Sequence, residues 1–173
     1  MHPFDRTAIG CRLLLLAASS LLAAPVARAS GPMPSVSGSL TAAGKTYQLA
    51  HVYARRQPSA SNPSQTVVVV LLTDNEVPKS IVDDKYRLEL TDMARDGKIH
   101  GVSVTIGPDK KLSGTGWIYA KEVGGAVVSR SDQQTFEPAR FDDSQVEGKA
   151  SGRGSFGDDP WEFAASFAAA LAH

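Results

Sequence analysis

The amino-acid sequence predicts an α+β fold that is mainly β: a single antiparallel-rich β domain, sandwich-like or barrel-like, with one packed helix. Residues 67–72 form an unbroken apolar run with four β-branched valines, which is typical of a strand buried on both faces. Residues 99–106 alternate between apolar and polar side chains, as in a strand with one solvated face. After residue 120 the chain consists of short apolar segments separated by turn residues, which favours further strands over helices.

The first 29 residues are predicted to be a secretory signal peptide rather than part of the fold. Arg6 and Arg12 precede an apolar run at residues 13–24, and the segment closes with the small residues Ala27 and Ala29. A transmembrane anchor is the alternative, but a bilayer needs about 20 apolar residues and this run is shorter. We therefore expect residues 1–29 to be removed, residues 30–35 to form a flexible leader, and residues 36–173 to form one β-rich domain that works in the periplasm or outside the cell.

The charge of the mature chain excludes some classes of partner. The whole chain has 18 basic and 18 acidic residues. Three of the basic residues and one of the acidic residues lie in the predicted signal peptide, so the mature chain has 15 basic and 17 acidic residues and a formal net charge of −2. A nearly neutral surface has no long-range field for nucleic acid or anionic lipid. We expect an unknown protein or small ligand as partner, no nucleic acid, and no membrane anchor once the signal is removed.

The single cysteine, Cys11, lies before the apolar run of the signal peptide, whereas a lipoprotein cysteine would follow that run. The mature chain is therefore expected to lack disulfides, thiol nucleophiles and thiolate metal ligands. No cofactor is expected.

The first half of the domain is expected to begin with a hairpin. Residues 36–41 and 46–56 read as two strands joined by a turn at residues 42–45, where Gly44 supplies a positive φ. A polar loop follows at residues 57–64. The apolar run at residues 67–72 is the expected central strand, and it ends at the turn-forming residues 73–75.

Residues 80–97 are the best candidate for the helix, with Gly97 at the position where a helix commonly stops. Leu90 and Met93 have helical spacing but Leu88 and Leu90 do not, so the helix is expected to begin late. The strand at residues 99–106 should then pair with a strand at residues 112–121.

The C-terminal part is read as four short strands, at residues 126–130, 135–141, 146–152 and 161–171. The last segment is ambiguous. Asp159 and Pro160 resemble a helix start, and the alanine-rich tail has high helix propensity. However, Trp161, Phe163 and Phe167 fit a period of two, so we favour a strand.

Two motifs have an ordinary structural explanation. Residues 152–157 match Gly-x-Gly-x-x-Gly, but the chain ends before the second strand and acidic residue of a dinucleotide site, so a glycine-rich turn is expected. Ser155 could be a hydrolase nucleophile with His51 or His100 as base. The nucleophile elbow of hydrolases has glycine two residues before the serine, but this chain has Arg153 there, so the hydrolase alternative is disfavoured.

Metal binding is a second alternative. His51 and His100 could be ligands, yet neither has a second histidine or carboxylate two positions further along its strand. Carboxylates gather at positions 74, 76, 83 and 84 without the spacing of a calcium loop. No metal site is predicted from these residues.

Trp117 and Tyr119 share one face of an edge-like strand and could form a platform for sugars or peptides, or could simply cover one end of the core. The candidate ligand-binding residues lie on three expected strands; they are His51, Tyr53, His100, Trp117 and Tyr119. No catalytic residue is predicted.

Several stretches resemble uncharacterised exported bacterial proteins of mixed, β-rich fold. They comprise residues 71–74, Val77-Pro78, residues 94–102, residues 146–149 and Trp161-Glu162-Phe163. The resemblance covers most of the predicted domain and implies a closing strand at Trp161, but it implies no catalytic residue.

The sequence therefore predicts an exported soluble protein that binds a ligand or assists a partner and has no catalytic activity. The alternatives are a periplasmic metal-binding protein and, less favoured, a serine hydrolase.

Overall fold

The computed structural model describes residues 34–82, 87–130 and 133–172. The described strands are β1 (Ser35–Ala42), β2 (Lys45–Gln48), β3 (His51–Pro58), β4 (Thr66–Thr73), β5 (Gly101–Ile106), β6 (Leu112–Ala120), β7 (Gly125–Arg130), β8 (Gln134–Phe141), β9 (Gln145–Phe156) and β10 (Asp159–Ala172). The described helices are α1 (Lys79–Val82), α2 (Leu88–Arg95) and the short 3₁₀ helix η1 (Lys121–Val123).

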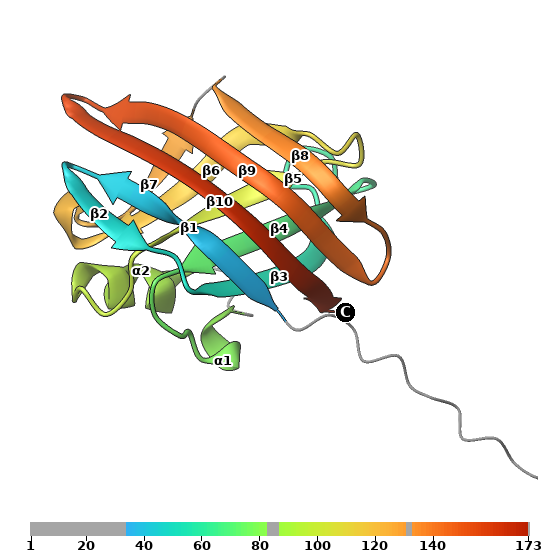
Figure 1. The fold of residues 1–173 in the computed structure, drawn as a ribbon, viewed down its shortest axis with the longest axis horizontal. Helices are drawn as coiled ribbons and strands as arrows, with labels where there is room; N and C mark the ends of the chain where they lie inside the picture. The colour runs from blue at the N-terminus through green and yellow to red at the C-terminus, as the bar shows by residue number, and fades with distance from the viewer. Residues whose placement is uncertain (1–33, 83–86, 131–132, 173) are drawn as a thin grey trace, which may run out of the picture.

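The strands form one curled mixed sheet, a half-barrel, in which two layers face each other (Figure 1). The front layer has the strand order β8-β9-β10-β1-β2, and the back layer has the order β3-β4-β5-β6-β7. The long strand β10 belongs to both, because it pairs antiparallel with β1 and β9 and its last residues pair in parallel with β3. This confirms the predicted fold class, an antiparallel-rich, mainly β domain.

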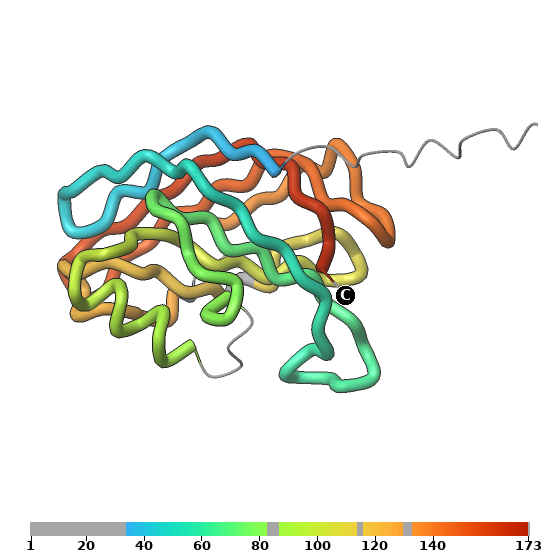
Figure 2. The backbone as a smooth tube through the Cα atoms, turned by 90° about the horizontal axis from the view of Figure 1, so that it is seen from below, coloured from blue at the N-terminus to red at the C-terminus, as the bar shows by residue number. Residues whose placement is uncertain are grey.

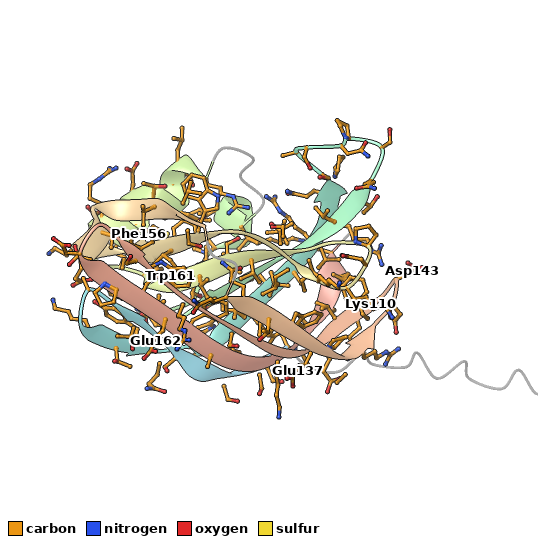
Figure 3. All side chains as sticks on the ribbon, turned by 90° about the horizontal axis from the view of Figure 1, so that it is seen from above. Lys110, Glu137, Asp143, Phe156, Trp161 and Glu162 are labelled. Carbon is orange, nitrogen blue, oxygen red and sulfur yellow. The ribbon has the colours of Figure 1, made fainter. Side chains whose placement is uncertain are left out.

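The main core lies between the two layers. Side chains of β10 alternate strictly, so that Trp161, Phe163 and Phe167 are buried while Glu162 faces solvent. Figure 3 shows Trp161 between the layers and Glu162 on the opposite face of its strand. Burial of this apolar surface is the main force that holds the layers together. The closing segment is therefore a strand, as its period of two predicted.

A second cluster lies on the outer face of the back layer, where α2 packs against the sheet. Its buried members are Leu71, Val77, Leu90, Ala94, Ile99 and Tyr119. Figure 2 shows α1 and α2 on the side of the back layer that faces away from the front layer. The central strand β4 is therefore covered on both faces, as its unbroken apolar run predicted.

The predicted strand at residues 46–56 is wrong as a single element. β2 pairs with β1 in the front layer, and β3 pairs with β4 in the back layer. Between them, the Leu49 amide donates to the carbonyl of Gly38 and the Ala50 amide donates to the carbonyl of Thr73. The side chains that face the main core shift by one position here, from Leu49 to Val52 and Ala54. The sequence pattern does not reveal this break because both faces of the segment carry apolar side chains. β1 also begins at Ser35, inside the segment expected to be a flexible leader.

The predicted helix over residues 80–97 corresponds to two short helices. α2 begins at Leu88, in agreement with the expected late start, and residues 83–86 lie outside the described residues. At its end, the amides of Gly97 and Lys98 donate to the carbonyls of Ala94 and Met93. Gly97 has a φ of 70°, so it ends the helix as predicted.

Two predictions of solvent exposure are wrong. Ser103 in β5 is only 2% exposed, because Arg87 and the helical segment cover this face. Tyr119 is fully buried, and its strand β6 lies between β5 and β7 rather than at an edge.

The motif at residues 152–157 lies mainly in a strand. Gly152 and Gly154 belong to β9, and only Gly157, with a φ of 60°, forms the turn.

Among the described residues, no helix has the length and apolar character needed to cross a bilayer. The predicted signal peptide and Cys11 lie outside the described residues.

Candidate functional site

The outer face of the back layer gathers several of the candidate residues in neighbouring rows. The register places Tyr53 opposite Leu71, Leu71 opposite Ser103, and Ser103 opposite Trp117. In the next row, Gly101 is opposite Tyr119. Because alternate residues of a strand share a face, this row structure brings side chains from β3, β5 and β6 to one surface.

Arg87 lies over this surface at the start of α2. Its backbone is left-handed, with a φ of 56° and a ψ of 20°. The guanidinium donates from one nitrogen, Nη1, to Ser103 Oγ at 3.0 Å and to Tyr119 Oη at 3.1 Å. It also lies 5.8 Å from the ring centre of Trp117, within the range of a cation–π contact. These contacts fix the guanidinium against the sheet.

Beside Arg87 there is a cavity of about 20 Å³. We call it the Arg87 pocket and define it by the polar residues that line it, Tyr53, Arg55, Arg87, Ser103 and Tyr119. Apolar side chains of β4, α1 and α2 complete its wall. A cavity of this size has room for about one water-sized group, and the polar groups that converge on it can orient such a group.

The hydroxyl groups of the pocket are available as donors. Ser103 Oγ and Tyr119 Oη accept hydrogen bonds from Arg87, and Tyr53 Oη accepts one from the Val77 amide at 2.7 Å. Each hydroxyl therefore keeps its own O–H for another partner. Burial raises the pKa of Tyr119 even though Arg87 and Arg55 act to lower it, so this phenol stays protonated at neutral pH.

No protein-family model, curated protein or solved structure matches this chain.

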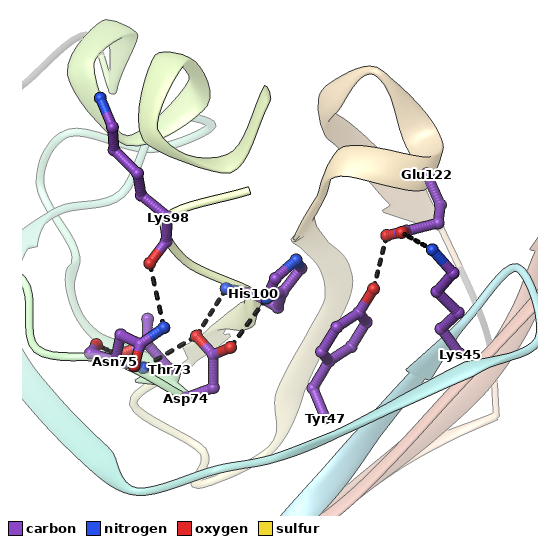
Figure 4. A network of polar contacts seen from close by, with 8 residues as sticks. All are labelled: Lys45, Tyr47, Thr73, Asp74, Asn75, Lys98, His100 and Glu122. Atoms are coloured by element: carbon purple, nitrogen blue, oxygen red, sulfur yellow. Dashed lines mark hydrogen bonds and ion pairs between the residues drawn. The ribbon is translucent and has the colours of Figure 1, made fainter. Parts of the chain in front are cut away.

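A second polar cluster lies where β4 ends and β5 begins (Figure 4). Asp74 Oδ1 accepts hydrogen bonds from the amides of Asn75 at 2.8 Å and His100 at 2.7 Å. Asp74 Oδ2 lies 2.7 Å from Nδ1 of His100. The His100 ring stacks on Tyr47, with 3.7 Å between ring centres and 5° between planes.

Tyr47 extends this cluster to the front layer. Its hydroxyl donates to Glu122 Oε2 at 2.7 Å, and Lys45 Nζ donates to Glu122 Oε1 at 2.8 Å. Burial and the neighbouring Glu122 carboxylate raise the pKa of Tyr47. Burial acts to raise the pKa of Glu122 as well, but the hydrogen bonds from Lys45 and Tyr47 outweigh it and lower this pKa to about 2.

The Asp74–His100 pair has the geometry that orients an imidazole in many active sites. Catalysis or metal binding would need a nucleophile or further ligands beside it. The described part of the chain contains no group of three or more metal-binding side chains. Asp83 and Asp84 lie outside the described residues. Ser155 lies opposite Pro160 on the β9–β10 hairpin, and the described side chains give it no hydrogen bond to a histidine.

Four of the five candidate residues lie at the two sites, and His51 lies at neither. Tyr53 and Tyr119 line the Arg87 pocket, and Trp117 lies beside it through its contact with Arg87. His51 is in β3 and lies opposite Thr73 of β4. It is two residues before Tyr53 and on the same face of the sheet. His100 belongs to the Asp74 cluster instead.

Sequence reasoning missed Arg55, Arg87 and Ser103. Arg55 continues the alternation of His51 and Tyr53, so its position on this face could have been inferred. Arg87 gives no such signal, because a charged residue near a helix start is usually solvated. Ser103 was assigned to a solvated face because the cover over it comes from a distant part of the chain.

Proposed function

We propose that this chain is an exported binding or accessory protein rather than an enzyme, and that its ligand site is the Arg87 pocket. The observation that carries the proposal is the convergence of hydrogen-bond donors from β3, β5, β6 and α2 on one small cavity. Ordered donors without acceptors are costly in a folded protein unless a ligand or water meets them.

In this proposal the Asp74–His100 pair has a structural role. Both oxygens of Asp74 are already engaged, one by two backbone amides and the other by the imidazole. That arrangement ties the end of β4 to the start of β5, which is a structural role.

Ligand binding can be tested with a pocket-filling variant. Val82 lines the pocket from α1, so Val82→Phe should block it. Val128→Phe makes the same chemical change on β7, at a side chain that is 38% exposed and outside the pocket. The full chain is expressed, and the purified protein is screened by thermal unfolding against mixed small molecules, both charged and neutral.

We expect at least one compound to raise the melting temperature of the wild-type protein and of Val128→Phe, with the effect lost in Val82→Phe. Equal stabilisation of all three proteins would place the ligand elsewhere. Turnover of a compound by the purified protein would contradict the proposal that it is not an enzyme.

Export has its own test. Expression of the full chain in a bacterium, followed by fractionation and N-terminal sequencing, should yield a periplasmic or secreted product that begins at Ser30. A cytoplasmic product that retains residues 1–29 would refute export.

A further inference from the structure

We infer that the Arg87 pocket binds the oxyanion head group of its ligand, a carboxylate or phosphate group. This inference rests on the proposed binding function and names the chemical class of the ligand. Three features of the pocket support it: its charge, its hydrogen-bonding groups and its size.

The charge of the pocket is positive. Two arginines, Arg55 and Arg87, line the same cavity, and no carboxylate residue is among the described residues that line it. In the described part of the chain, neither arginine takes part in an ion pair, whereas Arg56 next to Arg55 pairs with Asp143. Two arginines with no counter-charge among the described residues favour an anion, and the planar guanidinium group matches the oxygens of a carboxylate or phosphate.

The hydrogen-bonding groups of the pocket have the same polarity. The hydroxyl oxygens of Tyr53, Ser103 and Tyr119 already accept hydrogen bonds from the protein, which leaves their protons to be donated. Arginine has five N–H donors and no acceptor. Arg87 uses a single nitrogen, Nη1, for Ser103 and Tyr119. A ligand at this site must therefore accept several hydrogen bonds, as an oxyanion does.

The size of the cavity restricts what can enter it. A cavity of about 20 Å³ has room for one group of the size of a water molecule, which needs roughly 10–15 Å³ by this measure. One oxygen of a head group fits, and the rest of the ligand must remain outside. The pocket therefore recognises a terminal group rather than a complete ligand.

The experiment follows the indole N–H signal of Trp117, which lies beside Arg87, by NMR in the protein purified from the full chain. Sodium acetate and sodium phosphate are the oxyanion probes, sodium chloride at matched ionic strength controls for salt, and acetamide is the neutral analogue of acetate. We expect a saturable shift with acetate or phosphate and none with chloride or acetamide.

Variants identify the groups responsible. Arg55→Gln removes one charge from a side chain that makes no hydrogen bond within the described part of the chain, so the fold should persist, and the dissociation constant should rise about tenfold or more. Arg87→Lys keeps the charge but loses the planar fork, and it should also weaken binding. Arg95→Gln is the matched control, because Arg95 is 58% exposed at the far end of α2 and pairs with Asp92; it should bind like the wild type.

Several outcomes would overturn the inference. If acetamide shifts the signal as acetate does, or if Arg55→Gln binds acetate as tightly as the wild type, the pocket binds a ligand that is not an oxyanion, and the proposed binding function survives. If chloride saturates the site equally well, the site is not built for an oxyanion. If the thermal-unfolding screen also finds no compound that stabilises the wild-type protein more than Val82→Phe, the proposed binding function fails too.

Discussion

Two side chains, Asp74 and Arg87, each organise several polar groups, and the atoms that they use distinguish their roles. Asp74 engages both carboxylate oxygens with Asn75 and His100. Arg87 holds Ser103 and Tyr119 through one nitrogen. A side chain whose polar atoms are all engaged stabilises the fold, whereas one that is fixed in place with donors to spare can also bind a ligand.

Glu122 should make the stability of the protein depend on acidic pH. Its pKa in the folded state is about 2, below the ordinary value of 4.5. A lowered pKa means that the carboxylate stabilises the fold above about pH 4.5, and that this contribution is lost as the pH falls toward 2. The shift alone would correspond to about 3 kcal/mol. Because Lys45 is 65% exposed and therefore screened, we expect about 1–2 kcal/mol.

The measurement is urea unfolding of wild type and Glu122→Gln between pH 7 and pH 2. The wild type should have the higher free energy of unfolding at pH 7, and its difference from Glu122→Gln should disappear as the pH falls toward 2. Glu137→Gln, at an exposed position on β8, serves as the control and should follow the wild type. Parallel curves for wild type and Glu122→Gln over the whole range would show that Glu122 has no such role.

At the scale of elements, the β9–β10 hairpin depends on close contact between glycines and aromatic rings. A Cβ atom on Gly152 would lie 2.8 Å from the Phe163 ring, and one on Gly154 would lie 2.7 Å from the Trp161 ring. Both rings are buried between the layers. The glycines of the Gly-x-Gly-x-x-Gly motif thus make room for the core rather than for a phosphate.

Gly154→Ala should therefore destabilise the protein by about 1–3 kcal/mol, the usual cost of overpacking a core. Ser155→Ala, one residue further along the same strand and exposed, creates the same alanine on the outer face and should change stability by less than about 0.5 kcal/mol. Urea unfolding compares the two variants with the wild type. Equal stability of Gly154→Ala and Ser155→Ala would mean that Trp161 has space to move.

The elements also show which features of the fold a sequence can predict. Alternation identified β10 correctly against its high helix propensity, because both faces of that strand have a constant environment along its length. The break at Leu49 and Ala50 was not predicted, since apolar side chains on both faces of the segment hide the shift of the core-facing positions from Leu49 to Val52 and Ala54. The burial of Ser103 depends on Arg87, whose position is set by tertiary packing. Local patterns predict strands, but they do not predict what covers them.

At the scale of the whole molecule, contacts between residues far apart in the sequence join the two layers. Lys45 and Tyr47 on β2 reach Glu122 after β6. Arg56 on β3 donates to the backbone carbonyl of Asp142, in the turn between β8 and β9. Such pairs leave no trace in local spacing, so the Asp74–Tyr47–Glu122 cluster was beyond sequence reasoning although His100 itself was selected.

The C-terminal end of β10 closes the half-barrel, and its removal should open the back layer. Leu171 is buried, lies opposite Ala54 in the parallel pair with β3, and donates its amide to the carbonyl of Ser144. Deleting residues 171–173 removes this side chain from the core, which should cost about 2–4 kcal/mol in urea unfolding. Deleting His173 alone is the control and should have little effect.

Because β1 and β9 still pair with the rest of β10, the truncated chain should remain folded, with faster amide hydrogen exchange in β3 than in β1. Equal acceleration in both strands, or an unchanged unfolding midpoint, would show that the parallel pair does not hold the layers together.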